Sequence, residues 1–422
     1  MTLTVLHTSD WHLGRLLYGR SRDQEFEAFL EWLLETIRRQ QVDVLLVAGD
    51  IFDSSTPTHQ AQALYYRFLS AVSLTPCQHV VIIGGNHDSP TLLNAPQALL
   101  QALNVYVIGH ALAPEEEVLI LRDAQQRPQL MVAAVPYLRE RDVRHMRSGE
   151  TLEEKAANYV QGVEAHYEQV AQAALACQQA LDVEVPVIAM GHLFTAGGYT
   201  QSDDGVRDVI VGGLGHVRPQ LFDQVFDYVA LGHLHVPQAV GGRDWVRYSG
   251  SPLPMGFGEA TQQKSVCLIQ IVGPPSAPPD ARRPLEITLV PVPEFQRLRR
   301  IEGDWAHIET QLQAYKDEHA SIWLEIIYTG DEVIGELRAR VNALIEGSQL
   351  EVLRLQNQLL MREILAPIQA DKALPDLTPH EVFERRLESL QVTPDQRRDL
   401  ISTYGEALQL LEQASTERAS EP

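Results

Sequence analysis

Short apolar segments that end at Gly, Asp, Asn or His are the feature that most constrains the fold of this chain. Their length and their content of Val, Ile and Leu predict buried strands whose C-terminal ends open into loops. The six segments are residues 3–6, 42–47, 80–83, 130–135, 187–190 and 228–231. Apolar residues at helical spacing from Phe26 to Ile37 separate the first two, which indicates a β-α-β unit. We therefore expect an α/β fold with polar residues at its strand ends, where open α/β sheets carry their sites.

The polar residues at these strand ends are of the kinds that bind divalent metals. Asp, Asn and His suit Mn, Fe, Zn or Mg, and the absence of cysteine among them disfavours a closed structural zinc site. Two ions about 3.5 to 4 Å apart need a shared carboxylate and could hydrolyse a phosphate ester; Asp50, alone after Gly49, is the candidate bridge. The candidate metal ligands are Asp10, His12, Asp50, Asn86, His192, His233 and His235.

The sequence GGNHD at residues 84–88 also offers a group that can transfer protons. Asn86 is a neutral oxygen ligand, so the histidine beside it need not bind metal. We expect His87 to be the catalytic proton donor and Asp88 to orient its imidazole. A single Asp-x-His or His-x-His pattern is more often structural, but five such motifs at five strand ends indicate a catalytic site.

Charge and composition limit the functions that this chain can have. A formal net charge of -22 argues against a generally basic nucleic-acid-binding surface, although bound cations or a basic partner subunit would reconcile it with a DNA substrate. No apolar stretch approaches the roughly 20 residues of a membrane-spanning helix. The start, MTLTVLHTSDWH, has no signal-peptide pattern. We expect a cytoplasmic protein that does not contact a membrane.

Two changes in composition predict the domain boundaries. The segment GPPSAPPDARRP, residues 273–284, contains five prolines and is the expected linker. It separates a domain at residues 1–272 from a small α+β domain at 285–373, where residues 285–292 and 323–328 resemble strands and 332–345 a helix. After LPDLTP at 374–379, amphipathic helices are expected within residues 374–422.

In these motifs the chain resembles the calcineurin-like metallophosphoesterases, which carry D-x-H, G-D, G-N-H-D, G-H and G-H-x-H in this order. Within that superfamily it resembles the bacterial SbcD family of nuclease subunits. The narrower resemblance rests on four segments and on the LTPHEVFERRL segment, residues 377–387. The four segments are SDWHLGR at 9–15, GDIFD at 49–53, GNHDS at 85–89 and YSGSPLPMGFGE at 248–259.

The resemblance implies an α/β fold built as a calcineurin-like metallophosphoesterase β-sandwich flanked by helices, with a small α+β capping domain and C-terminal helices. It implies one metal held by Asp10, His12, Asp50 and His235, and a second held by Asp50, Asn86, His192 and His233. His87 would assist the leaving group, with Asp88 as its partner. Asp53 stands where another branch of the family often has a histidine, so the role of that histidine cannot be transferred.

The resemblance also implies manganese as the metal, exonuclease and endonuclease activity at DNA ends and hairpins, and association with the nucleoid while the protein is on DNA. Its expected partner is a coiled-coil ATPase of the SbcC type, in a heterotetramer that contains a homodimer of this chain. The capping domain would help select DNA, and the C-terminal helices would dock on the ATPase, with Phe383, Leu387 and Leu408 as the residues to test. Packing of these helices within the chain is the alternative.

Two other classes of function compete with a DNA nuclease. A stand-alone metallophosphoesterase would act on a small nucleotide or a phosphoprotein and would need neither the added domain nor the C-terminal helices. A noncatalytic scaffold with a degenerate fold is the third class, and the complete set of candidate ligands argues against it.

Overall fold

The computed structural model describes residues 2–143, 150–199, 216–223, 225–273, 283–332, 334 and 336–358, together with Phe383, Leu387, Arg397, Leu400, Ile401 and Tyr404. The chain divides into two compact units, Met1–Arg297 and Leu298–Pro422. No helix in the described part of the chain is long and apolar enough to cross a membrane.

The first unit contains a six-stranded sheet in the order β14-β13-β1-β4-β5-β6. Four neighbouring strands run parallel, and the last two along the chain pair antiparallel at one edge. The parallel strands are β1 (Thr2–Thr8), β4 (Val44–Ala48), β5 (His79–Ile83) and β6 (Val105–Ile108). The antiparallel strands are β13 (Ser265–Val272) and β14 (Leu285–Pro291).

A second six-stranded sheet has the order β11-β12-β10-β9-β8-β7. Its central strands β12, β10, β9 and β8 are parallel, and a short antiparallel strand closes each edge. The strands are β7 (Val118–Arg122), β8 (Pro128–Ala134), β9 (Val187–His192), β10 (Tyr228–Gly232), β11 (Gln238–Val240) and β12 (Arg243–Tyr248). All six strands that the apolar segments predict are therefore present.

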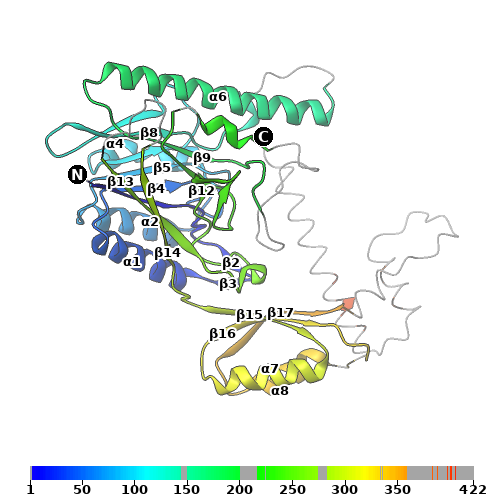
Figure 1. Ribbon diagram of the computed structural model, residues 1–422. Helices are drawn as coiled ribbons and strands as arrows, with labels where there is room; N and C mark the ends of the chain where they lie inside the picture. Colours follow the sequence, from blue (N-terminus) through cyan, green and yellow to red (C-terminus); the bar gives the residue numbers. More distant parts are fainter. Residues whose placement is uncertain are drawn as a thin grey trace. The chain divides into compact units, whose positions relative to one another are not determined.

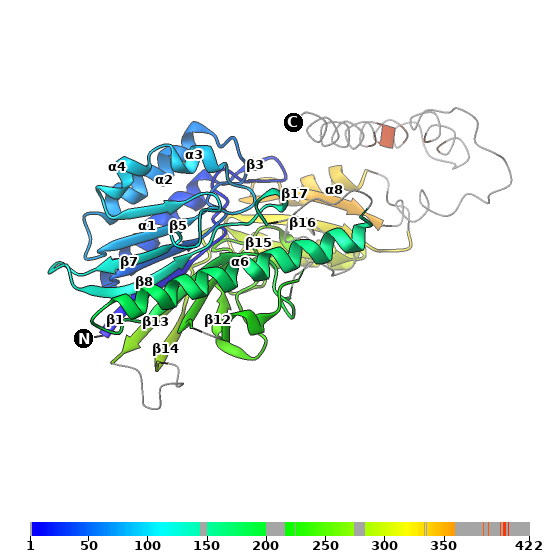
Figure 2. The same ribbon diagram turned by 90° about the horizontal axis from the view of Figure 1, so that it is seen from above.

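The two sheets pack face to face, and helices cover their outer faces (Figures 1 and 2). Alternate residues of β4 point to opposite faces, so Leu46 joins the core between the sheets and Leu45 packs under the helices. Helices α1 (Asp23–Arg39) and α2 (His59–Val72) cover the first sheet, and the long α6 (Leu152–Ala180) covers the second. The first unit is thus an α/β sandwich flanked by helices, as the resemblance implies.

Short elements fill the connections of the first unit. The hairpin strands are β2 (Leu16–Leu17) and β3 (Arg20–Ser21). The short helices are α3 (Pro90–Asn94), α4 (Gln97–Gln101), α5 (Glu140–Val143), and the 3-10 turns η1 (Pro219–Asp223) and η2 (Phe257–Glu259).

Up to residue 358, the described part of the second unit contains a three-stranded sheet and two helices around its own core. Buried residues such as Leu324 and Ile326 on the central strand pack against Ile308 and Leu312 of a helix. Trp323 is buried and Trp305 packs against this core, so both tryptophans contribute to the packing of the second unit. The elements are β15 (Arg297–Gly303), α7 (Trp305–Asp317), β16 (Ile322–Tyr328), α8 (Leu337–Ile345) and β17 (Leu350–Asn357).

The boundary between the two units lies further along the sequence than the proline-rich segment, where we expected it. The strand expected to open the capping domain, residues 285–292, becomes β14 and pairs with β13 along its whole length. Its backbone hydrogen bonds therefore belong to the first sheet, and the chain passes into the second unit only at Arg297. Residues 274–282 of the expected linker lie outside the described residues.

Most of the predicted C-terminal helices at 374–422, including Leu408, lies outside the described residues. The six described positions beyond residue 358 are all helical. Phe383 and Leu387 are 7% and 1% exposed, and the Phe383 ring stacks on Tyr404 with centroids 4.0 Å apart. Both side chains are thus buried within the chain, which favours packing within the chain over docking for these two residues.

Candidate metal centre

The two sheets place all seven candidate ligands at one end of the sandwich. Asp10 and His12 follow β1, Asp50 follows β4, and Asn86 follows β5, and these three strands are parallel neighbours. The remaining histidines come from the ends of β9 and β10, which are parallel neighbours in the other sheet. Because parallel strands end at the same edge of a sheet, residues far apart in the sequence meet here.

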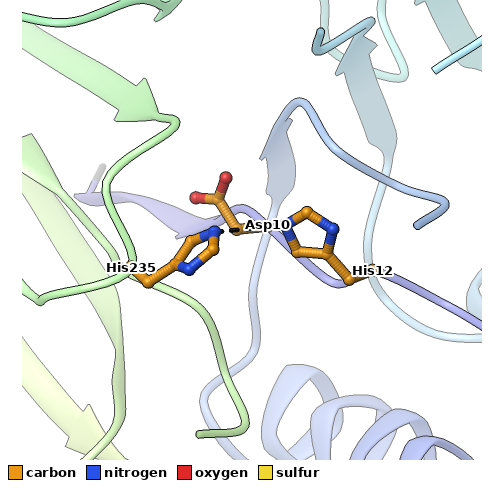
Figure 3. Close-up of side chains that lie close together, drawn as sticks. All are labelled: Asp10, His12 and His235. Atoms are coloured by element: carbon orange, nitrogen blue, oxygen red, sulfur yellow. Dashed lines mark hydrogen bonds between the residues drawn. The ribbon is translucent and has the colours of Figure 1, made fainter. Parts of the chain in front are cut away.

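Asp10, His12 and His235 form the first cluster of possible ligands. Figure 3 shows the two imidazoles and the carboxylate converging from the segments after β1 and β10. The Nε2 atoms of His12 and His235 lie 3.1 Å apart. Two nitrogens that each bind one ion at about 2.1 Å are separated by about this distance. The donor set therefore fits a divalent metal ion.

A second group gathers around the side chain of Asn86. Its Oδ1 atom lies 3.0 Å from His192 Nε2 and 3.0 Å from His233 Nδ1. Asp10, Asp50 and His192 also bring ligand atoms within reach of one ion. One amide oxygen between two imidazole nitrogens is a donor set for Mn, Fe or Zn, which accept both kinds of ligand.

The carboxylate of Asp50 lies between these two groups. Its Oδ2 atom is 3.3 Å from His192 Nε2 and 3.6 Å from His12 Nε2. Its Oδ1 atom accepts a hydrogen bond from the backbone N–H of His87 at 2.9 Å. Asp50 therefore lies at the centre of the site, between the two groups of candidate ligands.

Several of these residues have a backbone conformation that side chains rarely adopt. Asp10, His12, Asp50 and His233 have φ values of 53°, 49°, 50° and 101°. A positive φ costs free energy in a residue with a side chain, and such residues concentrate at functional sites because the surrounding structure holds them there. The strained turns direct these side chains into the space between the strand ends.

At the centre of the site, the ionised carboxylate of Asp50 and the protonated imidazole of His192 stabilise each other. Burial alone would raise the pKa of Asp50, but the charge and hydrogen bond of His192 hold it well below its usual range. Burial would lower the pKa of His192, but Asp50 raises it to about 9. Burial also raises the pKa of Asp10 to about 7 and lowers that of His233 to about 3. A metal ion must therefore displace a proton from His192.

The structure corrects the expected partner of His87. Its Nδ1 atom lies 2.8 Å from the backbone carbonyl of Asp53. Asp88, which the sequence suggested as the orienting carboxylate, instead accepts three backbone N–H groups, from Ile51, Phe52 and Gly85. Asp88 therefore ties together the loops after β4 and β5 and does not contact the His87 imidazole.

Sequence reasoning missed the residues that surround the ligands. Asp53 contacts His12 Nδ1 at 3.3 Å and Arg15 at 3.0 Å through the same carboxylate oxygen. Ser9 donates to Asp10 at 2.5 Å and lies 2.8 Å from the hydroxyl of Ser249. The segments SDWHLGR, GDIFD and YSGSPLPMGFGE contain these residues, so the resemblance pointed to the region but not to the contacts.

Comparison with known families identifies the class of this site. Residues 3–237, more than half of the chain, match the model of the calcineurin-like phosphoesterases. The fold and the paired clusters agree with this match, so the first unit is a phosphoesterase domain of that family. Residues 294–391 match the model named "Type 5 capsule protein repressor C-terminal domain".

Comparison with curated proteins identifies the family within this superfamily to which the chain belongs. The chain is 37% identical over 403 residues to the SbcD subunit of the SbcCD nuclease of Escherichia coli strain K12, covering 94% of this chain and 96% of the relative. The SbcD subunits of Rhodobacter capsulatus and Bacillus subtilis are 39% and 35% identical, over 64% and 63% of this chain and 67% and 66% of theirs. The chain belongs to the SbcD family of nuclease subunits.

Proposed function

We propose that this chain is the metal-dependent nuclease subunit of an SbcC–SbcD type complex and hydrolyses DNA phosphodiesters at double-strand ends and hairpins. The observation that carries the proposal is the position of Asp50, whose carboxylate lies between two clusters of nitrogen and oxygen donors. The family of the chain supports nucleic acid as the substrate, since the relatives are named as nucleases.

The proposed ligands of one metal are Asp10, His12, Asp50 and His235, and those of the other are Asp50, Asn86, His192 and His233. A pair of divalent ions, which we propose to be Mn²⁺, supplies Lewis acidity that lowers the pKa of water and neutralises charge on a phosphoryl oxygen. The chain itself fixes the donors on strained turns at rigid strand ends, so little reorganisation is needed when substrate binds.

His87 has the proposed role of proton transfer to the leaving oxygen. Its Nδ1 atom faces the carbonyl of Asp53, which can only accept, so Nδ1 carries hydrogen. Nε2 is the atom left for substrate, and the imidazolium form, which carries a second hydrogen there, would donate that proton to the leaving oxygen and become the neutral ring. Its ring centroid is 4.9 Å from that of the ligand candidate His12, which places it beside the cluster. In this proposal Asp88 acts indirectly, by fixing the loop that carries His87.

The proposed partner is an SbcC-type coiled-coil ATPase, and the proposed assembly is a heterotetramer that contains a homodimer of this chain. The names of the relatives support the partner because they describe one subunit of a two-part nuclease. The helices within residues 374–422 are the proposed docking segment, and the second unit the proposed DNA-selecting domain. Because Phe383 and Leu387 are buried in the chain, charged substitutions there would test folding of these helices rather than docking.

Substitution of Asp50 by Asn tests the proposal. Wild type and Asp50→Asn are incubated with hairpin DNA, linear DNA and a small phosphodiester, with Mn²⁺ and with or without the ATPase. We expect wild type to cut DNA and the variant to lose metal binding and cleavage together. Asp123→Asn, at an aspartate of the β7–β8 turn, is the matched control and should remain active. Full wild-type activity on the small ester without any on DNA would overturn the proposal.

A further inference from the structure

Three hydrogen bonds converge on the backbone carbonyl of His235, one of the proposed ligands, and the longest comes from the Ser251 hydroxyl at 3.5 Å. Lys264 Nζ donates to this oxygen at 2.9 Å and the backbone N–H of Ser251 at 3.2 Å. Lys264 Nζ also donates to the Ser251 hydroxyl at 3.0 Å. The Lys264 side chain is only 3% exposed, and a buried ammonium group is costly unless it is paired.

Glu259 supplies the opposite charge. It is fully buried, and its Oε2 atom lies 2.7 Å from Lys264 Nζ while accepting the backbone N–H of Met255 at 2.8 Å. Its Oε1 atom lies 4.0 Å from His235 Nδ1. The Lys264–Glu259 ion pair therefore contacts both the backbone of His235 and the segment before Glu259.

That segment, residues 249–255, which we call the serine loop, connects the ion pair to the other side of the first cluster. At its start, the hydroxyl of Ser249 lies 2.8 Å from that of Ser9, and Ser9 donates to Asp10 Oδ2. Through the serine loop, polar contacts thus run from Lys264 to both Asp10 and the backbone of His235.

The serine loop packs closely against the backbone of His235 and is anchored at its far end. Gly250 has a φ of 73°, and a Cβ atom there would lie 2.7 Å from the carbonyl oxygen of His235. At the far end, the guanidinium of Arg22 donates to the carbonyl of Pro254 at 2.6 Å. Arg22 is itself buried and paired with Glu25, so this anchor comes from the start of α1.

We propose that the buried Lys264–Glu259 pair is a positioning device for metal binding, which fixes the backbone of His235 and, through the serine loop, the carboxylate of Asp10. The inference rests on the proposed function, because it takes these two residues as ligands. A buried ion pair is often no more stabilising than apolar residues of similar size. What the pair adds here is a set of directed hydrogen bonds to a ligand-bearing backbone, which apolar side chains cannot supply.

The first experiment measures metal binding in Lys264→Met, which keeps the length of the side chain but removes its donors. Mn²⁺ is titrated calorimetrically into the metal-free full-length protein. Loss of a supporting contact to a metal ligand typically costs 10- to 100-fold in metal affinity. We expect a Kd for Mn²⁺ raised by about this factor, and cleavage that recovers its kcat at high Mn²⁺ concentration.

A double variant separates positioning from stability. Lys264→Met leaves the Glu259 carboxylate buried without its cation, whereas Lys264→Met with Glu259→Gln removes that charge as well. We expect the double variant to regain thermal stability while its Mn²⁺ affinity stays low, because the hydrogen bond from Lys264 to the His235 carbonyl is still missing. Glu117→Gln, at a buried pair with His166, is the control and should lower stability without changing Mn²⁺ affinity.

The outcomes distinguish this inference from the proposed function. A double variant with wild-type Mn²⁺ affinity, or one that fails to fold, would assign the pair to stability alone and overturn the positioning role. Wild-type protein that binds no Mn²⁺ would instead overturn the proposed metal site. Low affinity in a folded double variant, together with normal affinity in Glu117→Gln, would support the positioning role.

Discussion

At the scale of single residues, backbone carbonyl groups determine which histidine nitrogen is available. His87 Nδ1 faces the carbonyl of Asp53 at 2.8 Å, and His192 Nδ1 faces that of Ala48 at 2.9 Å. A carbonyl only accepts hydrogen bonds, so both Nδ1 atoms carry hydrogen, and His192 Nε2 lies within the site, 3.0 Å from Asn86 Oδ1. The chain thus fixes, before any ligand arrives, that Nδ1 of each ring carries hydrogen and that any proton gained or lost is the one on Nε2.

The role of His87 leads to a prediction about rate. His87→Gln should leave Mn²⁺ affinity within about twofold of wild type and lower kcat by about 100- to 10,000-fold, because a positioned proton donor contributes a factor of this size. Calorimetry and steady-state cleavage of hairpin DNA measure the two effects. His110→Gln, at an exposed histidine, is the control and should behave as wild type. Unchanged cleavage by His87→Gln would exclude the proposed role.

The pKa of His192 leads to a prediction about how the affinity for Mn²⁺ depends on pH. Asp50 raises this pKa to about 9, against the effect of burial, so at neutral pH the imidazole is protonated in the metal-free protein. Metal binding must displace that proton, so affinity should rise by about tenfold per pH unit between pH 7 and pH 9, and more steeply below pH 7, where burial keeps the carboxyl of Asp10 protonated as well. Mn²⁺ titrations in buffers of different ionisation enthalpy count the protons released.

The pH dependence has its own control. His79→Gln removes a buried histidine outside the clusters and should leave the slope with pH unchanged. Affinity for Mn²⁺ that does not vary with pH would mean that His192 is neutral before metal binds, contrary to the prediction.

The sequence predicts which residues gather at this site better than what each one contacts. Asp10, Asp50 and Asn86 could be found because each follows an apolar segment, and parallel strands end together whatever their loops do. The contacts of Asp88 could not be found, because its three backbone donors come from two loops whose separation depends on the folded sheet. Proximity in sequence to His87 suggested a pairing that the turn geometry does not make.

At the scale of elements, the site depends on how closely the two sheets approach each other. A Cβ atom on Gly232, at the end of β10, would lie 1.8 Å from the carbonyl oxygen of Ala48, at the end of β4. Periodicity predicts both strands correctly from their own residues. It cannot predict that β14 joins β13, because that pairing depends on contacts across the proline-rich segment.

Gly232→Ala tests this close approach. The added methyl group must push apart two strand ends, and overpacking of this kind typically costs about 1 to 3 kcal/mol. We expect a lower free energy of unfolding in urea and weaker Mn²⁺ binding, since His233 and Asp50 follow these strand ends. Gly19→Ala is the control: no atom lies within 4 Å of the added Cβ, so it carries only the backbone cost of a side chain at a φ of 82° and should leave Mn²⁺ binding unchanged. Equal effects of the two substitutions would contradict the prediction.

At the scale of the whole molecule, the chain is built from two units with separate cores. The first sandwich carries every candidate ligand, and the second unit has its own core around β16. The apolar stripe at Phe383 and Leu387 shows the limit of sequence reasoning at this scale. An amphipathic pattern predicts that a face will be covered, but not whether the cover is another protein or, as with Tyr404, the same chain.

Separate cores predict that metal stabilises only one part of the molecule. Thermal unfolding of the full chain should show two transitions, because units with independent cores need not unfold together. Mn²⁺ at about 100 times its Kd should stabilise the first unit by about 2.7 kcal/mol for each of the two proposed ions, which raises its midpoint by about 5 °C per ion. Calorimetry with and without Mn²⁺ measures both midpoints, and in Asp50→Asn neither should move. One transition that shifts as a whole with Mn²⁺ would show that the two units unfold as a single cooperative body.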